Sequence, residues 1–72
     1  MDIVEIEERS QMRREAAAAR LRELADMLSR HNEVAFSREG LRYSVRVPDE
    51  ITFKVEIEIG TDESEIEIEL SW

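Results

Sequence analysis

The sequence predicts an α+β domain of two layers, in which one helix packs on a four- or five-stranded antiparallel meander sheet. Residues 65–72 alternate strictly between polar and apolar side chains, and residues 53–59 repeat this period of a half-buried strand. Residues 10–31 instead space their apolar side chains as a helix does. With 72 residues and no cysteine, the chain is expected to be a single domain, residues 1–72, without disulfides.

The first two elements are expected to be a strand and a helix. Residues 2–8 alternate as a strand, with Val4 and Ile6 on one face. The helix follows from about Ser10 to His31, because apolar residues recur there at intervals of three and four. This apolar stripe consists of Leu21, Leu24, Ala25 and Leu28, and Ala17 and Ala18 extend it towards the N-terminus.

The start of the helix has two candidate positions. Ser10 is a favourable N-cap, but a start there would put Arg14 in the middle of the apolar stripe. A start near Met12 and Arg13 avoids this, although arginine is a poor N-cap. At the other end, His31 is expected to be a helix-end residue, where the helix dipole favours a cation.

Three turns are expected to divide the rest of the chain into a meander. Residues 37–40 form a four-residue loop whose glycine can take a positive φ. Residues 48–50 begin with proline, which cannot donate a ladder hydrogen bond, and residues 60–63 form the third turn. Across the proline turn, we expect Val45 to face Phe53 and Arg42 to face Glu56.

The register of the last hairpin follows from parity. A slip by one residue would move the apolar side chains of one strand into water, so only alternate registers are allowed. Among the allowed registers, a four-residue loop over residues 60–63 divides the hairpin most evenly between its two strands. The expected pairs are then Ile57 with Ile66, Val55 with Ile68, Phe53 with Leu70, Glu58 with Glu65, Glu56 with Glu67, and Lys54 with Glu69.

The net charge of −8 lies entirely in the last third of the chain. Residues 1–48 hold nine acids and nine arginines, whereas residues 49–72 hold nine acids and Lys54 alone. The last two expected strands therefore carry a strongly negative charge, which argues against a sheet face that binds nucleic-acid phosphates. A single lysine beside nine arginines and eighteen acids also indicates a halophile-like composition.

Four segments resemble a known family: residues 12–17, 21–25, 45–50 and 67–72, the last reading Glu-Ile-Glu-Leu-Ser-Trp. They are similar to the amphi-Trp domain family of small prokaryotic proteins, and the proline turn followed by a strand that closes on tryptophan is the most specific part. The helix-start serine usual in such sequences is replaced by Arg13. The resemblance implies a prokaryotic domain of a family without an assigned biochemical activity.

The sequence contains no catalytic, metal-ligating or phosphate-binding motif. His31 is the only histidine, and zinc prefers several nitrogen or sulfur ligands, so we expect a structural or solvated role for it. Glutamates on an open strand face stand in a line, whereas calcium sites collect oxygens from a curved loop, so diffuse counterions are expected. We therefore expect no enzyme activity and no cofactor.

The candidate interaction surface combines the glutamates of the last hairpin with the terminal tryptophan. By parity Trp72 lies on the dry face, where we expect it to close the core, with an exposed anchor as the alternative. The arginines of the helix are expected to form ion pairs such as Asp26 with Arg30 rather than a phosphate site. The surface consists of Glu56, Glu58, Glu65, Glu67, Glu69 and Trp72.

These features favour a small non-enzymatic interaction module in the cytoplasm, with a protein partner or a second copy of the chain bound through a sheet edge or Trp72. The alternative is an acidic decoy surface that binds a basic, nucleic-acid-binding partner. No segment approaches the roughly 18 apolar residues of a membrane span, and the N-terminus lacks a leader pattern. Nothing implies a membrane, a nucleic acid or a small-molecule substrate as partner.

Overall fold

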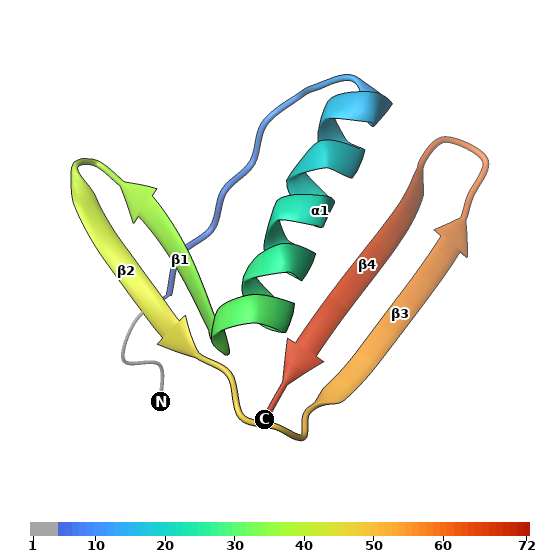
Figure 1. Ribbon diagram of the computed structural model, residues 1–72. Coiled ribbons are helices and arrows are strands. Elements are labelled where there is room, and N and C mark those ends of the chain that lie inside the picture. The colour runs from blue at the N-terminus through green and yellow to red at the C-terminus, as the bar shows by residue number, and fades with distance from the viewer. Residues whose placement is uncertain (1–4) are drawn as a thin grey trace.

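The computed structural model describes residues 5–72 and contains, within them, one helix and four strands (Figure 1). This confirms the predicted α+β class. Residues 2–4 of the expected first strand lie outside the described residues, and residues 5–8 are not in a strand. The elements are α1 (Arg14–His31), β1 (Glu33–Arg38), β2 (Leu41–Arg46), β3 (Thr52–Ile59) and β4 (Ser64–Ser71).

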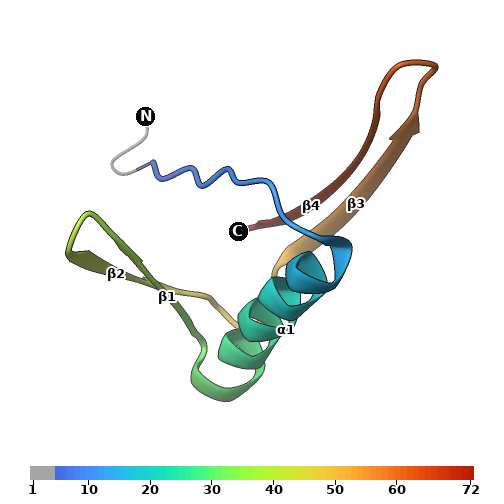
Figure 2. The ribbon, with the colours of Figure 1, turned by 90° about the horizontal axis from the view of Figure 1, so that it is seen from above.

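The strands form two separate antiparallel hairpins, so the predicted single meander sheet is wrong. β1 pairs with β2, and β3 pairs with β4. The helix lies between the hairpins, with β1 and β4 as the inner strands and β2 and β3 as the outer ones (Figure 1). Seen from above, the two hairpins diverge from each other (Figure 2).

The connection between β2 and β3 does not close these two strands into a hairpin. Pro48 offers no N–H to a ladder. The N–H of Val47 donates to the carbonyl of Asn32 at 2.8 Å, which continues the register of β1 with β2 one pair beyond Glu33 and Arg46. The ladder between β1 and β2 thus reaches from the turn to the end of the helix, directly before the proline. Since β2 and β3 are not neighbours, Val45 does not face Phe53, and Arg42 does not face Glu56.

The helix boundaries support the later of the two expected starts. α1 begins at Arg14, and Arg13 occupies the N-cap with an extended backbone (φ −70°, ψ 152°) but makes no capping hydrogen bond through its side chain. His31 is the last helical residue, as predicted, and Asn32 ends the helix in the left-handed conformation at φ 54°. Asparagine tolerates this conformation better than most residues.

Replacing Arg13 by serine should stabilise the protein by about 1 kcal/mol. A serine hydroxyl at this position can accept a hydrogen bond from a free N–H of the first turn, which the arginine side chain does not do. The melting temperature should rise by roughly 4–8 °C in thermal unfolding followed by circular dichroism. Arg13→Ala is the matched control, and equal melting temperatures for the two variants would contradict the capping argument.

One of the two hairpin turns differs from the turn that the sequence predicted, and the other agrees with it. The first is a two-residue turn of Glu39 and Gly40, both with positive φ (53° and 80°), so the expected loop over residues 37–40 was too long. Such a turn matches the twist of the strands, which lets Ser37 and Arg38 join the ladder. Residues 60–63 form the second turn as predicted, closed by a hydrogen bond from the Gly60 N–H to the Glu63 carbonyl at 2.9 Å.

The helix packs on the first hairpin only. The N–H of Ala35 in β1 points at the sulfur of Met27 at 3.4 Å, and the rings of Phe36 and Tyr43 stack across β1 and β2 at 5.7 Å. Among the described residues, Val47 is the one apolar side chain that is almost fully buried, with 8% of its surface exposed. The core therefore sits where the end of α1 meets the start of the proline connection.

Candidate functional site

The acidic face is the surface formed by the five glutamates of the β3–β4 hairpin. The register confirms every predicted pair: Glu58 lies opposite Glu65, Glu56 opposite Glu67, and Lys54 opposite Glu69. The order of residues alone places these carboxylates together, because strand side chains alternate between faces. The acidic face consists of Glu56, Glu58, Glu65, Glu67 and Glu69.

The carboxylates of the acidic face influence one another's protonation. A hydrogen bond with Glu65, followed by repulsion from the Glu65 charge, raises the pKa of the Glu67 carboxyl, and the charge of Lys54 opposes this shift. The ammonium of Lys54 lies 3.6 Å from a carboxylate oxygen of Glu56. One lysine therefore offsets only part of the crowded charge.

The acidic face encloses little space. A shallow cavity of about 40 Å³ is lined by Glu56, Glu58, Glu65 and Glu67. Within residues 5–72, no group of three or more potential ligands is placed to hold a metal ion. The geometry suits a solvated, negatively charged surface rather than an enclosed binding site.

Replacing Glu67 by glutamine should make stability at pH 7 higher and less dependent on pH. Because the folded pKa of Glu67 is raised, the folded protein binds more protons than the unfolded chain, so this residue destabilises the fold above its folded pKa. Stability should rise as the pH falls through the folded pKa and level off below the pKa of this carboxyl in the unfolded chain. Melting temperatures of both proteins between pH 7 and pH 4 measure this, and parallel profiles would contradict it.

Trp72 is 62% exposed, so its predicted role as the lid of the core is wrong. The indole lies at one end of an open apolar groove of about 280 Å³ rather than in a filled core. The backbone of the helix approaches β1 and not β4, so the end of β4 lies across the groove from the helix. The groove is lined by Leu24, Leu28, Val34, Val45, Val47, Leu70 and Trp72.

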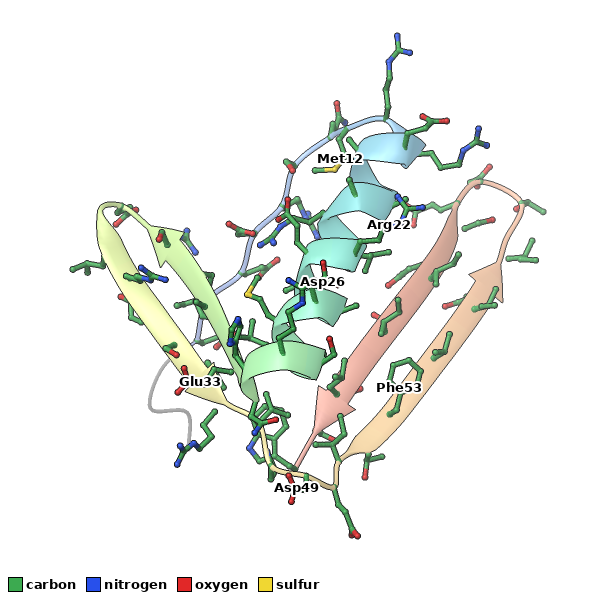
Figure 3. All side chains as sticks on the ribbon, viewed as in Figure 1. Met12, Arg22, Asp26, Glu33, Asp49 and Phe53 are labelled. Atoms are coloured by element: carbon green, nitrogen blue, oxygen red, sulfur yellow. The ribbon has the colours of Figure 1, made fainter. Side chains whose placement is uncertain are left out.

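The largest feature that the sequence did not predict is the uncovered apolar face of the β3–β4 hairpin. Phe53 lies on β3 with its ring over the hairpin (Figure 3). The alternation of the sequence identified these side chains, but it assumed that the helix covers them. The hairpin's apolar face consists of Phe53, Val55, Ile57, Ile59, Ile66 and Ile68, which are 46% to 84% exposed.

The remaining candidate residues lie apart from the hairpin. Arg20 pairs with Glu8 at 3.4 Å and with Glu23 at 3.2 Å, which ties the N-terminal segment to the helix. The expected pair of Asp26 with Arg30 is absent from the ion pairs of residues 5–72. His31 is exposed at the end of α1.

Comparison with known proteins identifies the family but no characterised relative. No helix within residues 5–72 is long and apolar enough to cross a membrane. Neither the curated proteins nor the solved structures give a match to this chain. The Amphi-Trp domain model matches residues 1–72, and the chain therefore belongs to the Amphi-Trp domain family.

Proposed function

We propose that the protein is a small non-enzymatic interaction module of the prokaryotic cytoplasm, which binds protein through the hairpin's apolar face and Trp72. The observation that carries this proposal is the exposure of six large apolar side chains on one side of the β3–β4 hairpin. Large apolar patches are rare on proteins that work alone, and they mark surfaces that bind partners.

The energetics of the hairpin support the same role. A two-stranded hairpin is at best marginally stable in water, because it buries little apolar surface. A partner that covers the hairpin's apolar face would supply the missing burial, at roughly 25 cal/mol for each Å² of apolar surface removed from water. Phe53 and Trp72 at the end nearest the groove are the aromatic residues expected to contribute most.

A second candidate function is an acidic decoy that occupies a basic, nucleic-acid-binding partner. The specific observation in its favour is the register of β3 and β4, which sets Glu56 opposite Glu67 and Glu58 opposite Glu65 on one exposed face. Such an array attracts a basic surface over several ångströms, and salt weakens this attraction strongly.

Capture of partners by a tagged protein at 0.1 and 1 M NaCl tests both candidates. Ile68→Lys alters the hairpin's apolar face, and Glu67→Gln changes the charge by the same amount on the opposite face. The interaction module predicts partners that persist at 1 M NaCl and are lost with Ile68→Lys only. The decoy predicts partners that dissociate at 1 M NaCl and weaken with Glu67→Gln. Partners insensitive to both variants would contradict both functions.

A further inference from the structure

We infer that the partner of the hairpin's apolar face is a second copy of this chain, packed face to face in a symmetric dimer. The inference rests on the proposed role as an interaction module and specifies what that module binds. In a two-fold dimer the same patch of both copies meets itself, so the patch must be self-complementary in shape, polarity and charge.

The amount of exposed surface is the first argument. The chain exposes 7191 Å², whereas a compact monomer of 8.5 kDa exposes about 4,700 Å². Its radius of gyration is 14.1 Å, against about 11 Å for a compact domain of this length. The excess of about 2,500 Å² is well above the roughly 800 Å² that each partner buries in a standard stable interface.

The uncovered apolar side of the β3–β4 hairpin, which contributes to this excess, is the second argument. The helix does not cover the β3–β4 hairpin, because no Cα atom of α1 lies within 8 Å of one in β3 or β4. Two sheets that pack face to face stand about 10 Å apart. A second hairpin is therefore a layer of suitable thickness, and it brings an apolar face of the same length and width.

Charge decides between this arrangement and pairing through the open edge of β4. An edge contact between two copies that keeps apolar residues on one face must set glutamates of β4 opposite glutamates of the other copy. Like charges directly opposite each other destabilise a sheet. In face-to-face packing the two acidic faces instead point away from each other, into water on opposite sides of the dimer.

The groove extends the surface that a second copy can cover. Leu70 and Trp72 follow Ile66 and Ile68 on the same face of β4, and both line the groove with Leu24 and Leu28 of α1. The hairpin's apolar face is thus continuous with an apolar cavity of about 280 Å³. A dimer formed through this face should bury Trp72, which makes the indole a reporter of assembly.

Sedimentation of the full chain over a range of concentrations tests the inference. We expect a species of twice 8.5 kDa, with Trp72 emission that moves to shorter wavelengths as the dimer forms. Ile57→Lys should raise the dissociation constant about a hundredfold or more, since a symmetric dimer contains the substitution twice. Glu58→Gln, with the same charge change on the opposite face, should leave the dimer intact. Salt at 1 M should tighten it, because each copy carries a net charge of −8.

Several results would overturn the inference. A mass of 8.5 kDa at every concentration would do so, and so would a dimer that Ile57→Lys leaves unchanged. If Ile57→Lys does not fold by circular dichroism, Ile59→Lys replaces it, since Ile59 is 84% exposed at the end of β3. A monomer that still captures other proteins through an Ile68-sensitive contact would exclude the second copy but retain the interaction module. A dimer unaffected by Ile57→Lys, together with no Ile68-sensitive capture, would reject both.

Discussion

Replacing Val47 by aspartate should unfold most of the protein, whereas the same substitution at Leu41 should be tolerated. Val47 is the one apolar side chain of residues 5–72 that is almost fully buried, and its N–H bonds to the Asn32 carbonyl at the end of the helix. An aspartate there would place a carboxylate among Leu24, Leu28 and the other apolar side chains that line the groove.

The expected size of this effect follows from the cost of an unpaired buried charge. That cost is several kcal/mol, a large part of the about 5–15 kcal/mol that stabilises a typical domain. Val47→Ala, which removes two methyl groups, should cost about 2 kcal/mol. Leu41→Asp is the matched control, since Leu41 is exposed at the start of β2.

Circular dichroism at fixed concentration, with thermal unfolding of each variant, measures the effect. We expect Val47→Asp to lose most of its helical signal and Leu41→Asp to retain it. If the two aspartate variants melted at similar temperatures, the contact between residue 47 and the end of α1 would not be holding the fold together.

Local structure was predictable from this sequence because it depends on period and parity. The alternation of residues 53–70 determined which side chains share a face, and the even loop of residues 60–63 gave the register of every glutamate pair. For the helix start the sequence left two candidates, and keeping Arg14 out of the apolar stripe favoured the later one, which the structure has. The acidic face was therefore available from sequence residue by residue.

Long-range arrangement was not predictable in the same way. The alternation of side chains shows that Trp72 and Ile66 lie on the apolar side of the last strand, but it does not show which element covers that side. The pairing of β2 with β3 likewise depends on the direction that the chain takes after Pro48, which no local pattern reveals, and the structure keeps the two strands in separate hairpins. The errors about Trp72 and about the single sheet have this common origin.

Raising NaCl from 0.1 to 1 M at pH 7 should raise the melting temperature by several degrees. The two pairs of opposed glutamates, Glu58 with Glu65 and Glu56 with Glu67, repel across the hairpin, and the screening length falls from about 10 Å to about 3 Å over this range. Arg42 was expected to offset Glu56, but β2 does not pair with β3, so that arginine is not beside the acidic face. Lys54 is left as the cation within it.

The double variant Glu56→Gln and Glu67→Gln separates this repulsion from the general effect of salt on apolar burial. Salt also strengthens burial at the hairpin's apolar face, so the variant should keep part of the increase in melting temperature and lose the part that is due to repulsion. The variant should also melt higher than the parent at 0.1 M NaCl and approach it at 1 M. A melting temperature of the parent that stayed constant or fell with salt would mean that Lys54, 3.6 Å from Glu56, already neutralises the array. The acidic face would then cost the fold nothing, and its charge would require an explanation in binding rather than in adaptation to salt.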